Sequence, residues 1–279
     1  LSDRPDRFIG LHFFYHPAKN RLVEIIPSSR TSSETIQSVI QYCGAMGKVV
    51  ILCKDRPGFV VNRFFVPWLN EACKLLDEGF GTPAEIDNVA KDCFDIGMGP
   101  FELMNLTGPS IALHSTDYLA SQLQVDRYKG ADSLRRLVEE GIQWDLAGVS
   151  GEFSSKDRKE IRNRLLGVVL CIASQIVEEE ICAMEDVDRG AKVGLRWPMG
   201  PFELANDLGV DVAHGIASDY AVLAGFESPI ILSTQGSEPF EFKLIDLEVT
   251  NGVASITFNR PEAMNALNEE VISQLTDLW

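Results

Sequence analysis

The sequence repeats itself at a fixed spacing, and this duplication limits the folds that the chain can adopt. A six-residue identity in phase with two other matches indicates a tandem duplication of one unit of roughly 100 residues. Two copies are too few for a solenoid, so we expect them to pack face to face as an internal pseudo-dimer. The motifs that recur 101 residues downstream without a gap are Asn62-Arg63 as Asn163-Arg164, Glu85-Ile86-Asp87 as Asp186-Val187-Asp188, and MGPFEL at 98–103 as MGPFEL at 199–204.

A fourth match, Asp117-Tyr118 with Asp219-Tyr220, has a spacing of 102 and is interpreted as a one-residue slip. The shared MGPFEL favours a structural over a catalytic interpretation, because glycine would end one helix and proline would open the next. The runs Phe64–Leu69 and Leu165–Ala173 are too apolar to be exposed, so both equivalent helices should be buried.

Three β-prone segments precede the repeats and predict the tail of an α/β sheet domain. Two are short runs at Phe8–Phe14 and Leu22–Ile26. The third, Lys48–Cys53, is continuously apolar, which is typical of a strand buried on both faces. Between the second and third, TSSE at 31–34 offers a hydroxyl cap and a nearby carboxylate, so we expect a helix there that ends near Gly44 or Gly47.

After the repeats the pattern changes again. Two β-prone arms flank Asn251-Gly252, a pair that favours a tight hairpin because both turn positions need positive φ. A helix-like stretch follows at Asn268–Trp279. We therefore expect a hairpin and a helix, the start of a further domain.

The composition excludes some partners. Acidic residues exceed basic ones by 41 to 25, and a formal net charge of −16 argues against nucleic acid and anionic membrane. Six cysteines and four histidines show no metal-site spacing. Cysteines within apolar runs favour buried, reduced thiols and an intracellular, cytoplasmic location. No apolar run approaches the ~20 residues that a membrane span needs.

Two strand-like segments each carry one ionisable side chain. His12 ends an apolar run, and Glu24 lies inside the next one, twelve positions later. Adjacent strands can bring such residues into contact. The residues alone leave two possibilities open: a hydrogen-bonded core histidine with a strand-edge charge, or a pair that acts in proton transfer.

Several motifs in order resemble the 3-hydroxyacyl-CoA dehydrogenases of β-oxidation, over about residues 5–225. They are RFIGLHFFYHPAKNRLVEII, KDRPGFVVNRFFVPWLNEACKLLDEG, PAEID and GMGPFEL. The last forty residues, with ITFNRPEAMNALNEEVISQL, resemble the start of an enoyl-CoA hydratase (crotonase) domain. The resemblance implies a bifunctional parent protein, with the dehydrogenase first and the hydratase second.

The resemblance assigns roles to individual residues. The histidine that matches His12 is the general base for the 3-hydroxyl group as hydride passes to NAD, and Glu24 matches the glutamate behind its imidazole. Asn62 matches an asparagine that binds the substrate, a CoA thioester. Gly58, in the preceding Pro-Gly-Phe, would let the backbone approach a ligand. A helix N-cap is the alternative for Asn62, and Asn163 is interpreted as structural.

The sequence departs from the family pattern at three places. Tyr15 stands where an asparagine near the nicotinamide is usual, which makes Tyr15 a candidate cofactor-binding residue. WDLAGVSGEF at 144–153 replaces a Lys-Gly-Gly-Phe-Tyr type motif. No GxGxxG turn is present, so the main NAD site and an active-site serine are expected upstream of Leu1. The hydratase carboxylates are expected downstream of Trp279.

The predicted fold is multidomain: a Rossmann-type tail, two all-α repeats packed as a pseudo-dimer, and the hairpin and helix that begin a crotonase fold. The predicted boundaries are 1–56, 57–150, 151–238 and 239–279. We expect a fragment of an NAD-dependent 3-hydroxyacyl-CoA dehydrogenase that is inactive alone. Two alternatives stay open: a non-catalytic docking or oligomerisation scaffold, and a dehydrogenase of free hydroxy acids.

Overall fold

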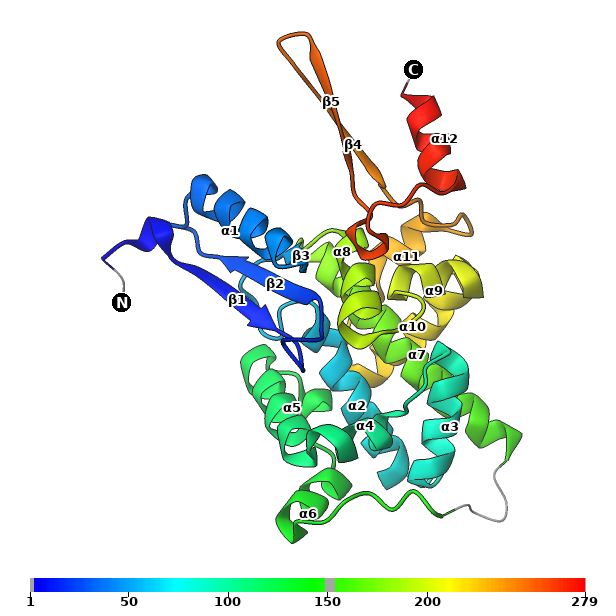
Figure 1. Cartoon of the computed structure of the whole chain (residues 1–279). Coiled ribbons are helices and arrows are strands. Elements are labelled where there is room, and N and C mark those ends of the chain that lie inside the picture. The colour runs from blue at the N-terminus through cyan, green and yellow to red at the C-terminus, as the bar shows by residue number, and fades with distance from the viewer. Residues whose placement is uncertain (1–2, 149–153, 279) are drawn as a thin grey trace.

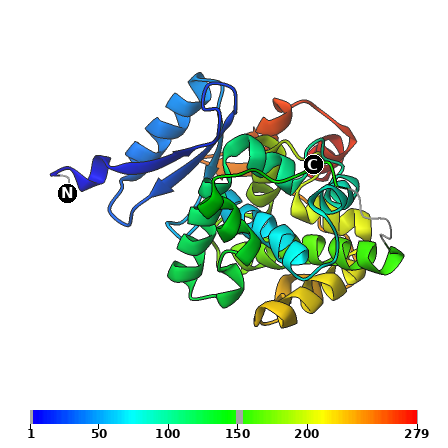
Figure 2. The ribbon, with the colours of Figure 1, turned by 90° about the horizontal axis from the view of Figure 1, so that it is seen from below.

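The computed structural model describes residues 3–148 and 154–278. The chain forms a small α/β unit, a helical body, and a hairpin with one helix that stand away from this body (Figure 1). Figure 2 shows the α/β unit beside the helical body, with the N-terminus on its outer side. The predicted boundaries at 150 and 151 lie outside the described residues.

The α/β unit is a three-stranded sheet with the order β1-β2-β3. Strand β1 (Ile9–Phe13) is antiparallel to β2 (Leu22–Pro27), which is parallel to β3 (Val49–Leu52). Helix α1 (Ser33–Ala45) connects β2 to β3, and the Ser32 side chain caps it by accepting the Thr35 N–H. The positions of the three strands and of this helix confirm the sequence-based prediction. The expectation that Lys48–Cys53 is buried on both faces is wrong, because β3 lies at the end of the described sheet and its Leu52 is 42% exposed.

The helical body consists of two sets of helices that correspond to the two sequence repeats. The first set is α2 (Val61–Asp77), α3 (Pro83–Phe94), α4 (Pro100–Thr107), α5 (Pro109–Leu123) and α6 (Asp132–Glu140). The second set is α7 (Ser155–Glu178), α8 (Met184–Arg189), a π-helical turn at Gly190–Leu195, α9 (Pro201–Leu208), α10 (Val210–Ala224) and α11 (Ile230–Gln235). Helices α4 and α9 begin and end 101 residues apart, and so do α5 and α10. The helices therefore follow the spacing of the motifs.

The same hydrogen bonds recur in both MGPFEL motifs. The Asp87 carboxylate accepts the N–H groups of Phe101 and Glu102 at the start of α4. Asp188 does the same for Phe202 and Glu203 at the start of α9. Each aspartate thus satisfies two of the N–H groups that a helix N-terminus leaves free, which confirms the structural interpretation of this motif.

One detail of that interpretation is wrong. Gly99 does not end the preceding helix, because α3 ends at Phe94 with Asp95 as its C-cap. Gly99 is instead the N-cap of α4, and its N–H donates to the Glu102 carboxylate. A side chain on Gly99 would collide with Asp87, so glycine is required by close packing.

The match of Asp117-Tyr118 with Asp219-Tyr220 is wrong as a structural equivalence. Helices α5 and α10 keep the 101-residue spacing along their whole length, so no residue is inserted. Tyr118 is 49% exposed, whereas Tyr220 is 2% exposed. One residue turns a helix by about 100°, and this rotation places the two tyrosines in different environments.

The core of the body lies where α2 packs against α7. Residues 165–173 of α7 are all buried, and so are residues 64–69 of α2 except for the partly exposed Phe65. Trp68 contacts the rings of Phe94 and Trp197, which ties α2 to both sets of helices. The predicted burial of both equivalent helices is confirmed.

Two ion pairs join α2 and the α7 segment reciprocally. Arg63 of α2 donates to Glu179, just after α7, through Nη2 at 2.5 Å from Oε1. Arg164 of α7 donates to Glu78, just after α2, with Nη2 at 3.0 Å from Oε1. The two pairs are equivalent in the repeats. Arg164 is the counterpart of Arg63, 101 residues later, and Glu78 is the counterpart of Glu179, 101 residues earlier.

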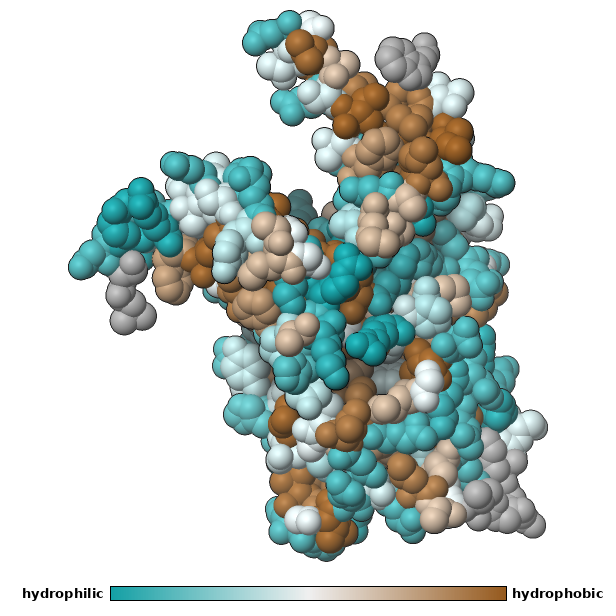
Figure 3. Space-filling view, in the orientation of Figure 1, coloured by the Kyte–Doolittle hydropathy of each residue, from teal (hydrophilic) through white to brown (hydrophobic). Residues whose placement is uncertain are grey.

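The C-terminal segment forms the predicted hairpin. Strand β4 (Ile245–Thr250) pairs antiparallel with β5 (Val253–Phe258) around Asn251-Gly252, whose φ angles are 53° and 76°. Helix α12 (Glu269–Asp277) follows and is capped by Asn268. Apolar residues gather on the hairpin and on α12 (Figure 3). The exposed ones include Leu247, Val249 and Val253 on the hairpin and Ile272 on α12.

The structure also bears on the thiol, membrane and metal predictions. Cys43, Cys53, Cys73 and Cys171 are free and buried, while Cys93 and Cys182 are free and partly buried. Within residues 3–148 and 154–278, no helix is long and apolar enough to cross a membrane. In the same ranges, no cluster of histidine, cysteine and acidic side chains could hold a metal ion.

Candidate active site

His12 and Glu24 are direct neighbours in the antiparallel register of β1 and β2. The His12 Nδ1 atom lies 2.6 Å from Glu24 Oε2. Glu24 is 0% exposed, whereas the His12 side chain is 29% exposed. The carboxylate is therefore enclosed behind the imidazole, and the opposite side of the ring can face a ligand.

The second oxygen of Glu24 is held by the start of a helix. Glu24 Oε1 accepts the N–H of Val60 at 3.1 Å and the N–H of Val61 at 2.9 Å. These are the free N–H groups at the N-terminus of α2, which favour a negative charge. Glu24 thus connects His12 to the helical body, a contact that the sequence analysis missed.

Two aromatic rings contact His12, Phe59 from the turn before α2 and Phe14 from just after β1. The Phe59 ring centroid lies 5.6 Å from the imidazole centroid, and that of Phe14 lies 4.7 Å away. Gly58 has a φ of +79°, and a Cβ there would come within 2.8 Å of Arg63 Cα. Glycine is therefore required here by the contact with Arg63, and the expectation that Gly58 lets the backbone approach a ligand stays a prediction.

Asn62 lies in the first turn of α2 and lines a cavity of about 500 Å³, here called the Asn62 cavity. The helix N-cap is Val60, so the N-cap alternative for Asn62 is wrong. Phe59 lines the cavity and also contacts His12, so the cavity lies next to the His12–Glu24 pair. The other lining residues are Asp55, Arg56, Pro57, Gly58, Val66, His114, Ser115, Tyr118, Leu119 and Gln122.

The residues from α5 in this wall were missed from the sequence. His114 and Ser115 are adjacent on α5 and carry no motif. One available signal was the repeat itself, since the residue equivalent to His114 is Gly215. A histidine whose equivalent position in the other repeat is glycine is a candidate for a role specific to its own repeat.

Tyr15, the candidate cofactor-binding residue, and Asn163, interpreted as structural, are not among the residues that line the Asn62 cavity. The Tyr15 side chain is 80% exposed, and its carbonyl accepts from Asn20 Nδ2 at 3.4 Å. Asn163 lies within α7 and accepts from Arg162 Nη1 at 3.4 Å. Of the segment at 144–153, residues 149–153 lie outside the described part of the chain.

Family comparison matches both the α/β unit and the helical body. A sequence model of the 3-hydroxyacyl-CoA dehydrogenase C-terminal domain matches residues 58–144 and 161–234, one segment in each repeat. The chain belongs to the 3-hydroxyacyl-CoA dehydrogenase family. The NAD-binding domain of the same family matches residues 1–56. The family resemblance in the sequence is therefore confirmed for both domains.

Individual relatives of this dehydrogenase family member agree. The mitochondrial hydroxyacyl-coenzyme A dehydrogenase of Mus musculus is 44% identical over 107 residues, which are 38% of this chain and 34% of the relative. The fatty acid oxidation complex subunit alpha of Vibrio parahaemolyticus is 29% identical over 250 residues, 78% of this chain and 35% of the relative. The chain thus spans about a third of the length of these relatives.

A solved structure shows the fold. The 3-hydroxybutyryl-CoA dehydrogenase of Escherichia coli K12 aligns with a TM-score of 0.71 at 18% identity, covering 84% of this chain and 71% of that one. At this identity the similarity concerns the architecture, and it agrees with the α/β unit and helical body described above.

Proposed function

We propose that this chain is part of an NAD-dependent dehydrogenase that reversibly oxidises 3-hydroxyacyl-CoA to 3-ketoacyl-CoA. The main support for this proposal is the contact between His12 Nδ1 and Glu24 Oε2. Glu24 is itself held in place by two backbone N–H groups at the start of α2. A histidine oriented by a buried carboxylate is an arrangement well suited to general-base catalysis.

In this proposal His12 moves the proton. Because Nδ1 faces Glu24, the Nε2 atom is the one available to accept the proton of the substrate hydroxyl. Glu24 stabilises the imidazolium that forms and keeps the ring in one tautomer. Bound NAD supplies the hydride acceptor. In the reverse direction the imidazolium returns its proton to the ketone oxygen.

The residues of this chain fit only part of an NAD site. No Gly-x-Gly-x-x-Gly sequence occurs in the 279 residues, and such a turn normally holds the dinucleotide phosphates. We propose that this chain supplies the residues that act on the substrate, and that it does not supply the turn that holds the NAD phosphates. Tyr15 remains a proposed neighbour of the nicotinamide, supported by its place just after the strand that carries His12.

The Asn62 cavity is the proposed site for the acyl end of the substrate. Asn62 would donate or accept a hydrogen bond near the reacting carbon, while Phe59, Val66 and Leu119 offer apolar surface to an acyl chain. A relative that belongs to a fatty acid oxidation complex supports a fatty acyl thioester as the substrate class. The free thiols support a reducing, cytoplasmic setting for the reaction.

We also propose that residues 239–279 begin an enoyl-CoA hydratase domain. A two-stranded hairpin is marginally stable by itself, and β4 and β5 leave Leu247, Val249 and Val253 exposed. Such a hairpin suits the first strands of a larger sheet. Hydration of an enoyl-CoA would then supply the 3-hydroxyacyl-CoA for oxidation.

The pseudo-dimer belongs to the same proposal. In a two-fold interface, a contact of residue i with residue j is matched by a contact of j with i. The pairs Arg63–Glu179 and Arg164–Glu78 follow this rule after a shift of 101 residues. We infer that the two repeats are related by an approximate two-fold axis along the α2–α7 contact.

The dehydrogenase is tested in the complete protein that contains this chain. NADH formation is followed with short, medium and long 3-hydroxyacyl-CoAs, and with the free hydroxy acids as controls. Oxidation of the thioesters, and its loss in His12→Ala, would support the proposal. Oxidation of free acids alone would favour the other dehydrogenase class, and a folded protein without turnover would favour the scaffold.

A further inference from the structure

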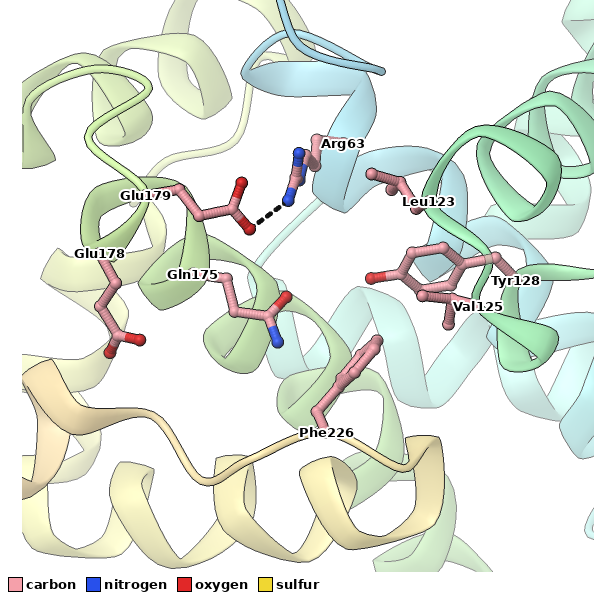
Figure 4. A pocket seen from close by; sticks show the side chains of 8 residues that line it. All are labelled: Arg63, Leu123, Val125, Tyr128, Gln175, Glu178, Glu179 and Phe226. Atoms are coloured by element: carbon pink, nitrogen blue, oxygen red, sulfur yellow. Dashed lines mark hydrogen bonds and ion pairs between the residues drawn. The ribbon is translucent and has the colours of Figure 1, made fainter.

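A second cavity, here called the Arg63 cavity, lies between the two repeats. It has a volume of about 280 Å³, and residues from both repeats line it. Leu123, Val125 and Phe226 give it apolar walls, and the Tyr128 hydroxyl and the Gln175 amide point into it (Figure 4). None of its lining residues lines the Asn62 cavity. A space of this size suits a small molecule.

The arginine of this cavity is incompletely paired. Arg63 is 4% exposed, and its Nη2 atom donates to Glu179. Its Nε and Nη1 atoms are buried and have no hydrogen-bond partner within the described ranges 3–148 and 154–278. Buried N–H groups without an acceptor carry a substantial free-energy cost. Such a guanidinium calls for a further acceptor.

The equivalent arginine in the second repeat shows what a complete set of partners looks like. Arg164 is bound by Glu78, the counterpart of Glu179, and also by Glu71, with Nε at 2.7 Å from Oε1. Glu71 in turn accepts from Arg127 Nε at 3.0 Å. Compared with the Arg63–Glu179 pair, this network has one additional carboxylate, Glu71, and one additional cation, Arg127.

Neither addition has a charged counterpart beside Arg63. Ile172 stands at the position equivalent to Glu71, and Ser228 at the position equivalent to Arg127. The charged residues that line the Arg63 cavity are Arg63, Glu178 and Glu179, so their sum is −1. A simple carboxylate would raise the excess negative charge. A ligand that carries both a carboxylate and a cation would leave the sum unchanged.

We propose that the Arg63 cavity binds a small zwitterion of the aliphatic α-amino acid class. The ligand carboxylate takes the place at Arg63 that Glu71 takes at Arg164, and the ammonium group takes the place of Arg127, against Glu178 and Glu179. The hydrocarbon side chain packs on Leu123, Val125 and Phe226. Carboxylate–guanidinium pairing is among the stronger interactions in proteins.

The site is tested by isothermal titration calorimetry on the purified chain, independently of any dehydrogenase activity. The probes are L-leucine and two compounds that each lack one of its charged groups, 4-methylpentanoate and 3-methylbutylamine. Saturable heat with leucine is expected, with both single-charge compounds about tenfold or more weaker, because each leaves one end of the site unpaired. No saturable heat with leucine, or equal binding of 4-methylpentanoate, would overturn the proposal.

Variants locate the binding. Glu178→Gln removes a charge but keeps the oxygen that accepts the Ile231 N–H at 2.8 Å, and Tyr128→Phe removes only a hydroxyl. Both variants should weaken leucine binding, and Glu178→Gln should do so several-fold. Glu178→Gln should not weaken the binding of 4-methylpentanoate, which has no ammonium group to pair with Glu178. The exposed Glu139 on α6 gives the matched control, Glu139→Gln, which should change nothing. Unchanged leucine binding in Glu178→Gln would place the ligand elsewhere and refute the assignment.

Discussion

Gly200 lies so close to Asp188 that no Cβ atom fits between them, and Gly99 stands in the same relation to Asp87. Replacing either glycine by alanine must displace an aspartate that holds the start of a helix. The duplication has therefore preserved a packing requirement together with the hydrogen bonds that depend on it.

We predict that Gly200→Ala and Gly99→Ala each lower the free energy of unfolding by about 1–3 kcal/mol, the usual cost of overpacking. Gly215→Ala is the control, because Gly215 is inside α10 and a Cβ there meets no atom within 4 Å. Gly215→Ala should stabilise by about 0.5–1 kcal/mol. Urea denaturation followed by circular dichroism measures all three, and a neutral Gly200→Ala would contradict the packing argument.

The His12–Glu24 pair gives a kinetic prediction for the complete enzyme. His12→Ala should lower kcat by roughly 10²–10⁴-fold, the usual contribution of a positioned proton-transfer group. KM for the acyl-CoA should change little, because His12 acts mainly in the transition state. Steady-state kinetics at several substrate concentrations separates the two constants. A large rise in KM with normal kcat would show that His12 only binds.

Glu24→Gln should affect both rate and stability. The amide cannot stabilise the imidazolium, so kcat should fall, and the double variant should be little slower than His12→Ala alone. The two N–H groups at the start of α2 bind a carboxylate more strongly than a neutral amide oxygen, so the free energy of unfolding should fall by about 1–3 kcal/mol. Kinetics and denaturation of the same preparations test this. If the kcat of the double variant fell by the product of the two single-variant decreases, the two residues would not act as a coupled pair.

The ion pairs between the repeats predict a dependence of stability on pH. Burial raises the pKa of Glu78, but the hydrogen bond and charge of Arg164, with Arg127, outweigh it and hold the pKa below its usual value. A lowered pKa stabilises the folded state above the ordinary carboxyl pKa, and this stabilisation is lost as the pH falls through the lowered value. Urea midpoints from pH 6 to 3 should therefore decrease.

Two variants check the origin of that decrease. Glu78→Gln removes the titrating group, so its urea midpoint should depend less on pH than that of the unmodified chain. Glu180→Gln is the control, because Glu180 pairs with Lys54 on the surface, where both side chains are largely exposed. Equal pH profiles for Glu78→Gln and the unmodified chain would show that Glu78 does not contribute.

The thiols should be unreactive in the folded chain. Burial raises the pKa of Cys93 to about 11 and that of Cys171 to about 12, and it holds the pKa of Cys73 well above its usual value. Since the thiolate is the reactive form, alkylation by iodoacetamide at pH 8 should be slow and should accelerate on unfolding. Mass spectrometry of timed samples measures this, and rapid labelling of Cys171 in the native state would be inconsistent with its burial.

Local patterns predicted much of the fold. The strands around His12 and Glu24 and the turn at Asn251-Gly252 follow from short apolar runs and from a turn that needs positive φ. The cap at Ser32 follows from hydroxyl chemistry next to a helical run. Each signal is contained in a few neighbouring residues, so the sequence alone was sufficient.

Contacts between distant segments could not be predicted in this way. Glu24 binds the backbone N–H groups of Val60 and Val61, and backbone groups leave no trace in the residue types. Asn62 matches a cap pattern, yet the N-cap of α2 is Val60, two residues earlier, where Glu24 accepts the first N–H groups of the helix. The unequal partners of Arg63 and Arg164 also depend on packing across the repeats.

The joining of both repeats in one chain has a consequence for how the interface can diverge. In an assembly of two identical subunits, every substitution appears on both sides at once. Here Glu71 faces an arginine on one side while Ile172 stands at the matching place on the other. The linkage also keeps the second repeat at a high effective concentration, so one side can lose contacts while the other holds the pair together. A duplicated interface thus becomes free to specialise one half at a time.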